Sequence, residues 1–331
     1  MAVNQGSFGT QTPLQRPTLS LKISKSVAKT GRNEKRHQHV NPECYLKAWC
    51  DPSTPPGQTP YIWIHARDGS TTDKKAPKKA FRELDFYTIK LTDGSRCLQI
   101  EDSFSVIEDR FTHLRDKRIV KGVRLDDVDR GLLCVFAAMM FIRTKSERET
   151  FTKFYTDLHK MVSAMEEQHN AEPTASAFAS AYKEYGHHVA IGDSIQNIAE
   201  ALFEMNLAMF VAADGEAFIT SDEPCVWHNP QSYKFPPMLR SPGLAQQDIE
   251  ISLPISPRYL ALFSWNKWNE KMSLDPEFLK ALGHCAPAPK GVVDHLNQRT
   301  RALCNEYFVT RDGRTEPIWF ELESRAGGFL G

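Results

Sequence analysis

Gly131-Leu-Leu-Cys-Val-Phe-Ala-Ala-Met-Met-Phe-Ile142 is the most apolar run in the chain, and it ends abruptly at Arg143. The run is too short to cross a bilayer, which takes about 20 apolar residues. It therefore predicts the buried centre of a helix. Working outward from it, a core-facing stripe follows helical steps of three and four through Leu125, Val128, Leu132, Phe136 and Met139.

The next step of four along this stripe lands on Arg143. A guanidinium stays protonated in proteins, so a buried one needs a carboxylate, an anionic ligand or an opening to water. Arg143 is therefore our first candidate for a functional site. The alternative is structural, with Arg143 paired to Glu101 or Glu108 across a helix contact.

Composition narrows the class of protein. The 331 residues include 41 basic and 41 acidic side chains, so no global charge favours nucleic acid or membrane binding. Seven cysteines form no C-x-x-C pair, and an odd number suits reduced thiols. No secretory signal opens the chain and no run reaches transmembrane length. We expect a soluble, cytoplasmic protein without a membrane partner, and the sequence leaves its oligomeric state open.

Periodicity predicts the elements. Helical spacing indicates helices over 43–50, 100–114, 125–142, 151–165, 194–210 and 290–305. Alternation indicates strands over 61–65, 86–91, 216–220, 225–227, 249–253, 259–263 and 307–310. Strands at both ends with helices between them favour an α+β fold, in which a long helical hairpin packs with a mostly antiparallel sheet. We expect that hairpin to pair the helix over 125–142 with the helix over 151–165, and Asn41 to cap the first helix.

Three regions divide the chain. Residues 1–36 make a basic arm, with no Asp or Glu before position 34, and we expect it to be disordered. A nucleic-acid-contacting tail and a transit peptide remain the functional alternatives for this arm. Residues 37–322 form a single α+β domain, and residues 323–331 form a flexible tail.

Five segments in order carry a family resemblance. They are His39-Val-Asn-Pro42 with Tyr45-Leu46, the segment Glu101 to Glu108, Phe141-Ile-Arg-Thr144, Phe218-Ile-Thr-Ser-Asp-Glu-Pro224, and Leu253-Pro-Ile-Ser-Pro257 with a late Asn297. Together they make the chain similar to domain-of-unknown-function family 4238. The resemblance implies a single α+β domain without an assigned activity. This chain departs from the family pattern at Glu223, where Asn is usual, and at Val40, where an aromatic often stands.

Several enzyme signatures are missing from the sequence. It contains no phosphate-binding P-loop, no dinucleotide-binding glycine turn, no nucleophile elbow and no H-E-x-x-H pair. P-loop hydrolysis, Rossmann redox chemistry and α/β-hydrolase chemistry are therefore disfavoured. What remains is a set of polar residues within or beside the five segments: His39, Glu101, Glu108, Arg143, Asp222, Ser256 and Asn297.

These residues suggest a metal-assisted phosphoester hydrolase or nuclease. Glu101 and Glu108 would hold Mg or Mn, which prefer oxygen ligands. Asp222 and His39 would act on water and the leaving group. Arg143, Ser256 and Asn297 would bind a phosphorylated small molecule or nucleic acid.

Two other hypotheses remain open. In one, the pocket is a non-catalytic anion- or ligand-binding module. In the other, each residue has a structural role, with Asp222 capping its own turn and Ser256 satisfying a loop between prolines.

Overall fold

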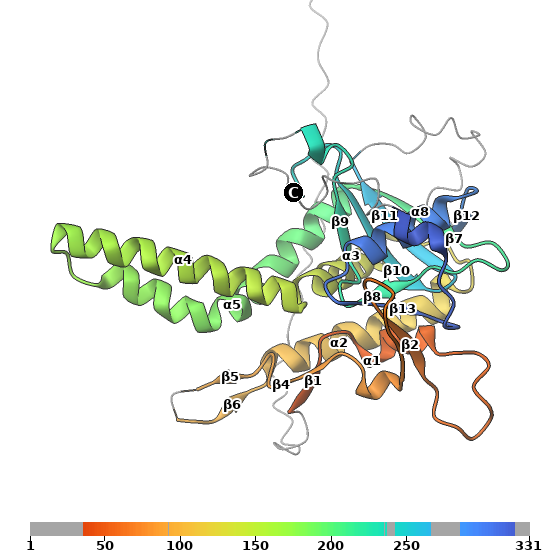
Figure 1. The fold of residues 1–331 in the computed structure, drawn as a ribbon, viewed down its shortest axis with the longest axis horizontal. Helices are drawn as coiled ribbons and strands as arrows, with labels where there is room; N and C mark the ends of the chain where they lie inside the picture. Colours follow the sequence, from red (N-terminus) through yellow and green to blue (C-terminus); the bar gives the residue numbers. More distant parts are fainter. Residues whose placement is uncertain (1–35, 92, 235, 237–241, 266–284, 322–331) are drawn as a thin grey trace, which may run out of the picture. The chain divides into compact units, whose positions relative to one another are not determined.

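The computed structural model describes residues 36–91, 93–234, 236, 242–265 and 285–321. The arm expected over 1–36, apart from its last residue, and the tail expected over 323–331 lie outside these ranges. The helices are α1 (Glu43–Leu46), α2 (Gln99–Leu114), α3 (Asp127–Ile142), α4 (Lys145–His169), α5 (Thr174–Glu204) and α8 (Val292–Ala302) (Figure 1).

Most strands belong to two sheets. The five-stranded sheet has the order β12 (Cys285–Pro287), β7 (Asn206–Val211), β11 (Tyr259–Ser264), β10 (Glu250–Ser256) and β9 (Val226–His228). The four-stranded sheet has the order β3 (Thr72–Lys75), β2 (Ile62–Ala66), β13 (Tyr307–Thr310) and β8 (Thr220–Ser221). Two small sheets pair β1 (His37–His39) with β4 (Arg82–Leu84), and β5 (Ile89–Lys90) with β6 (Arg96–Cys97). Within the described ranges only the β12–β7 pair is parallel, so the expected α+β class with mostly antiparallel sheets is confirmed.

The five-stranded sheet has helices on both faces, because its strands present apolar side chains alternately to one face and the other. On β11, Phe263 points into the core that α2 and α3 share, whereas Leu262 points into a smaller cluster with Leu296 of α8. Successive side chains of a strand point to opposite faces, so one strand serves both cores. The hairpin expected between β10 and β11 is confirmed.

Helix α3 lies in the larger core, as the apolar run predicted. Phe136 is fully buried and stacks on Phe111 of α2 with ring centroids 3.5 Å apart. Burying a side chain of this size stabilises the fold by about 1.5 to 3 kcal/mol. A capping box between Asp126 and Asp129 begins the helix. The expectation for Val128 was wrong: it lies in the first turn and is 81% exposed, because the core begins only further along the helix.

The long helical hairpin is made of other helices than expected. α4 packs antiparallel on α5, not on α3 (Figure 1). The side chain of Tyr155 lies so close to Gly186 that a Cβ there would sit 2.6 Å from its ring, so only glycine permits this approach. Asn170, in the left-handed region at φ 48°, ends α4. Residues 206–210, expected to be helical, belong to strand β7 instead.

Three further expectations were wrong, and one of them is the strand over 216–220, of which only Thr220 belongs to a strand, β8. Asn41 does not cap α1, whose N-cap position is Pro42 without a side-chain hydrogen bond. Most of the strand expected over 86–91 is a turn, and only β5 remains of it. No helix in the described part of the chain is both long and apolar enough to cross a membrane.

Candidate functional site

Arg143 follows the last residue of α3 and is 1% exposed. Its Nη1 donates to Glu108 Oε1 at 2.8 Å, and its Nη2 donates to the backbone oxygen of His39 at 2.7 Å. Nε lies 3.4 Å from the Tyr87 hydroxyl, and that hydroxyl donates to the Arg143 backbone oxygen at 2.7 Å. The rings of Tyr87 and Phe104 face the guanidinium at 5.6 and 4.7 Å. The side chain therefore joins β1, α2 and the turn before β5.

This environment keeps Arg143 charged. Burial alone would lower the pKa of Arg143, but Tyr87 and the Glu108 carboxylate outweigh burial and raise it further above its ordinary value. The expected pairing with a carboxylate of α2 is thus present, and Glu108 provides it. Because its donors point at protein acceptors, the guanidinium has little capacity left for a phosphate.

Tyr87 completes this arrangement, although no pattern in the sequence pointed to its role. It is fully buried, and burial raises the pKa of Tyr87 to about 12 despite the neighbouring Arg143. The Glu101 carboxylate adds to that rise, which places Glu101 in the same electrostatic environment. Tyr87 stays protonated at neutral pH and acts as the donor that fixes the end of α3.

Asp222 lies in the turn between β8 and β9. Its carboxylate accepts hydrogen bonds from the backbone N–H groups of Asn305, Glu306 and Tyr307 at 2.9, 2.7 and 2.9 Å. It therefore fixes the start of β13 rather than its own turn. Burial raises the pKa of Asp222 above its usual range, against the lowering effect of these three hydrogen bonds.

Two acids that the sequence analysis did not select lie next to this turn. The hydroxyls of Ser146 and Thr144, at the start of α4, lie near enough to the Glu223 carboxyl to lower its pKa. Burial raises the pKa of Glu223 to about 8, and the Asp222 and Glu147 carboxylates add to the rise. Burial also raises the pKa of Glu147 to about 7. Both side chains keep part of their surface exposed. We call Glu147 and Glu223 the acid pair.

Ser256 and Asn297 serve other segments. The Ser256 hydroxyl accepts from the backbone N–H of Arg258 at 3.2 Å, in the turn between β10 and β11. The Asn297 amide, on α8, accepts from Ile219 N at 2.9 Å and donates to Ala217 O at 2.8 Å. Asn297 thereby holds the segment that leads into β8, whereas Ser256 satisfies its own turn.

His39 contributes its backbone oxygen to Arg143 while its ring faces another loop. Nε2 lies 3.2 Å from the backbone oxygen of Lys78. Burial, together with Arg82, lowers the pKa of His39, so the ring is neutral at pH 7. In the described ranges no three His, Cys, Asp or Glu side chains come together as a metal site needs. Glu101 and Glu108, the expected ligands of Mg or Mn, therefore belong to no such group of three in this part of the chain.

Hydrogen bonds link all five motif segments in space, since Arg143 also pairs with Glu108 and the Tyr45 hydroxyl donates to the backbone oxygen of Pro254. Asn41 donates to the backbone oxygen of Ser221 at 2.7 Å, Arg143 binds the backbone of His39, and the Thr144 hydroxyl is close enough to lower the pKa of Glu223. The segments 39–41, 143–147 and 221–223 thus form one polar centre, although they lie far apart in the sequence.

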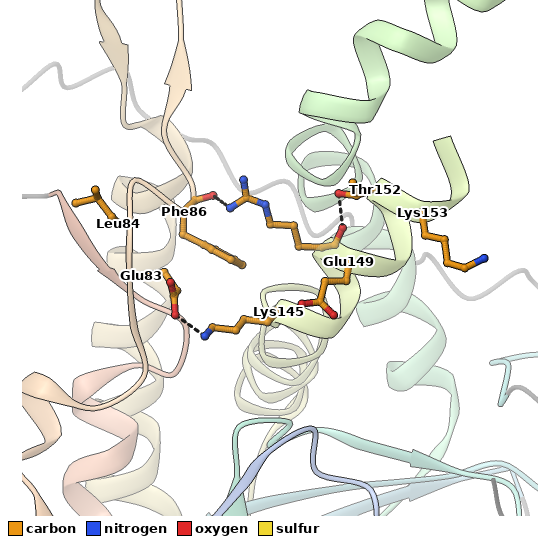
Figure 2. Close-up of a pocket in the computed structure, with 8 residues that line it drawn as sticks. Glu83, Leu84, Phe86, Lys145, Glu149, Thr152 and Lys153 are labelled. Atoms are coloured by element: carbon orange, nitrogen blue, oxygen red, sulfur yellow. Dashed lines mark hydrogen bonds and ion pairs between the residues drawn. The ribbon is translucent and has the colours of Figure 1, made fainter. Parts of the chain in front are cut away.

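A cleft opens on the other side of α4. It has a volume of about 540 Å³, and Figure 2 shows Glu83, Leu84 and Phe86 on one wall and side chains of α4 on the other. The α4 wall carries three cations and an acid: Lys145, Arg148, Lys153 and Glu149. Glu147 lies two positions after Lys145, about 200° around the helix, so the acid pair and the cleft occupy opposite faces of α4.

A model of the family described as "Protein of unknown function (DUF4238)" matches residues 37–314. The chain belongs to the DUF4238 family. Neither the curated proteins nor the solved structures contain a match. The resemblance noted in the sequence is therefore confirmed, and all five motif segments fall within the matched residues.

The sequence of this DUF4238 protein contains two features that could have drawn attention to the acid pair. Glu223 was visible only as a departure from the family pattern. Glu147 lies three residues after Thr144, and Thr-x-x-Glu before a helix is typical of capping. Thr144 does accept from the Glu147 backbone N–H, at 3.4 Å. The capping pattern accounts for the backbone at this position but not for the half-buried carboxyl.

Proposed function

We propose that this DUF4238 protein is a hydrolase that works by acid–base catalysis, with Glu223 as proton donor and Glu147 as base. The observation that supports the proposal is the acid pair itself: two half-buried carboxyls with pKa values raised to about 8 and about 7, of which Glu147 adds to the rise at Glu223. Perturbed acids that solvent can still reach are characteristic of catalytic sites, because an acid or base works best when its pKa lies near the working pH.

The order of the two pKa values assigns the roles. Between pH 7 and 8 Glu147 has lost its proton while Glu223 still holds one. Glu147 can then remove a proton from water as the water oxygen attacks the substrate, and Glu223 can protonate the leaving oxygen as its bond breaks. The products leave Glu147 protonated and Glu223 ionised, and proton exchange with solvent restores the starting state.

A small phosphoester is the substrate class that we favour. Lys145 lies near the polar centre, because Asp222 and Glu306 both raise its pKa along with its hydrogen-bonded partner Glu83. Its ammonium pairs with Glu83 in the cleft, so it would attract a phosphate toward this end of α4 without contacting it at Glu147 (Figure 2). Nucleic acid has less support, since the acids around the pair would repel a polyanion. Arg143 acts here as a positioning residue, because it fixes the turn from which α4 begins.

The test is a phosphatase assay on purified full-length protein across pH 5 to 10. p-Nitrophenyl phosphate and its bis-ester serve as substrates, with Mg²⁺, with Mn²⁺ and with a chelator. We expect a narrow bell-shaped profile with limbs near pH 7 and pH 8. Glu223→Gln and Glu147→Gln should each lower kcat by about 100-fold or more. The matched control is Glu167→Gln, an exposed acid in the last turn of α4.

Two outcomes would contradict this proposal. One is wild-type protein that hydrolyses neither ester under any metal condition. The other is equal activity in the wild type and the Glu223→Gln variant, which would assign the hydrolysis to a contaminant.

A second candidate function is a ligand-binding module, and the cleft favours it. Arg148 stacks on Phe86 at 4.7 Å and donates to the Phe86 backbone oxygen over a long 3.4 Å, so its guanidinium keeps donors for an anion. Pyrophosphate at 100 times its Kd would stabilise the fold by about 2.7 kcal/mol. A thermal shift with pyrophosphate that Arg148→Met removes, without hydrolysis of either ester, would favour this function over the enzyme.

A further inference from the structure

Helix α4 exposes a stripe of large apolar side chains. Phe154, Met161 and Met165 are 58, 57 and 53% exposed. With the half-buried Leu158 between them, they follow helical steps of four, three and four, so they lie on one side of the helix. The sequence predicted that a helix over 151–165 packs on the helix over 125–142, yet α4 has no fully buried residue. Apolar side chains that have the spacing of a buried helix face are thus exposed in the single chain.

Helix α5 repeats the pattern. Phe178 and Val189 are 56 and 41% exposed. The half-buried Tyr182 and Tyr185 lie between them, again at steps of four, three and four. Isolated exposed apolar residues are ordinary on protein surfaces, but two aligned stripes on paired helices are not.

Both stripes lie on the same side of the hairpin. Tyr155 and His159 mark the side of α4 that meets α5, because Tyr155 contacts Tyr182 at 5.2 Å and His159 binds the backbone oxygen of Ser176 at 3.0 Å. The α4 stripe lies about 90° from that side, and the α5 stripe lies about 80° from its own contact side. Both helices are right-handed and they run antiparallel, so these rotations bring the two stripes to one face.

Ring contacts agree with this placement. Phe154 meets Tyr155 at 5.1 Å, and Tyr182 stacks on Phe178 at 4.4 Å. Together with the Tyr155–Tyr182 contact, they make a continuous row of rings from one stripe to the other. The opposite side of α4 carries polar residues such as Thr152, Thr156 and Ser163. We call Phe154, Met161, Met165, Phe178 and Val189 the apolar face.

We propose that the apolar face binds the same face of a second copy of this chain, so that two hairpins form an antiparallel four-helix bundle. A hairpin has half the helices of such a bundle, and steps of three and four are the spacing of bundle cores. One surface used by both copies is what a two-fold dimer requires. Two neutral chains, each with 41 basic and 41 acidic residues, do not repel one another strongly.

The size of the face is sufficient for a specific dimer. Because Tyr155 lies opposite Tyr182 and Gly186, the two stripes together extend over about 16 residues of helix, or roughly 24 Å, and two helices side by side are roughly 20 Å wide. The contact would then cover roughly 500 Å² on each copy, or roughly 1,000 Å² in total, which is about the least area that a specific interface needs.

Sedimentation equilibrium of the full-length chain between 1 and 50 µM tests the proposal. We expect a species of twice the 37.6 kDa mass of one chain. Met161→Glu places a charge in the middle of the face, and we expect the dimer to dissociate about 100-fold more readily or better. Phe178→Glu, on the other helix, should have the same effect. Met161 and Phe178 are exposed in the single chain, so circular dichroism should show unchanged helix content for both variants.

Ala164→Glu is the matched control, since Ala164 is exposed on the same helix about 80° away from the stripe. A dimeric wild type and control beside monomeric Met161→Glu and Phe178→Glu would support the proposal. A monomeric wild type at 50 µM would overturn it. It would also be overturned if the stripe variants stayed dimeric, or if Ala164→Glu dissociated the dimer equally.

Discussion

Arg143 and the acid pair belong to the same polar centre, and Glu147 follows Arg143 by four positions in the chain, yet their environments differ in one decisive way. The guanidinium is 1% exposed and has a protein acceptor or a ring on each side. The carboxyls of Glu147 and Glu223 are partly buried, form no ion pair with a cation among the residues that the structure describes, and have raised pKa values. A buried charge with good partners is compatible with a stable structure. A partly buried acid without such partners destabilises the fold when it is ionised, but it can still exchange protons with a substrate. The comparison assigns a structural role to Arg143 and a proposed catalytic role to the acid pair within one polar centre.

The largest effect should come from Arg143→Met. The substitution leaves the Glu108 carboxylate, whose side chain is 21% exposed, without its partner. We expect a loss of about 3 to 5 kcal/mol in the free energy of unfolding, measured by urea denaturation. Glu108→Leu in the same chain should recover part of that loss. Unchanged stability combined with lost ligand binding would instead make Arg143 a binding residue.

Asp222→Asn should cause the next largest loss of stability. The carboxylate accepts three backbone hydrogen bonds, and an amide replaces one acceptor oxygen by a donor that faces an N–H group. We expect a loss of about 2 kcal/mol, measured in the same way. From the sequence alone Asp222 suggested a catalytic carboxylate whose replacement would leave stability nearly unchanged. An unaltered melting temperature with abolished hydrolysis would restore that interpretation.

The acid pair should make stability depend on pH. The folded-state pKa values of about 8 and about 7 lie above the ordinary value of 4.5, so the folded state binds more protons than the unfolded state in this window. Stability is then fully present below about pH 4.5 and falls as pH rises through 7 and 8. We expect a decrease of about 2 kcal/mol between pH 5 and 8, after discounting for solvent screening. Glu223→Gln should flatten this dependence, as followed by thermal unfolding at several pH values.

Ser256→Ala should have the smallest effect. Its hydroxyl only accepts one hydrogen bond from Arg258 in an exposed turn. We expect a loss of about 0.5 kcal/mol and unchanged hydrolysis of the phosphoesters. A large fall in kcat would return Ser256 to the site.

The sequence could predict the position of Arg143 because the helical steps around it are regular and a guanidinium cannot lose its charge. It could also predict the β10–β11 hairpin and the apolar side of α2, where local spacing determines the element. Tyr87 could not be found, because its role depends on contacts with the distant Arg143. The acid pair was hidden for a similar reason: its pKa values arise from burial between α4 and the β8–β9 turn, which no local pattern encodes.

The apolar stripe of α4 illustrates a different limit. Its spacing is the same whether its own chain or a second copy covers it, so periodicity predicted burial without saying which molecule provides it. The expected partner, α3, is instead occupied by α2, α5 and the five-stranded sheet. Only the exposed fractions of Phe154, Met161 and Met165 reveal the uncovered surface.

The most direct test of the central claim is the titration of the Glu223 side-chain carboxyl, followed by carbon NMR on glutamate-labelled full-length protein. The Glu223→Gln variant assigns its signal. The account predicts a midpoint near pH 8, with the Glu147 signal titrating near pH 7. Midpoints near 4.5 for both carboxyls would contradict it, because the acid pair would then be two ordinary ionised acids with no proton to donate.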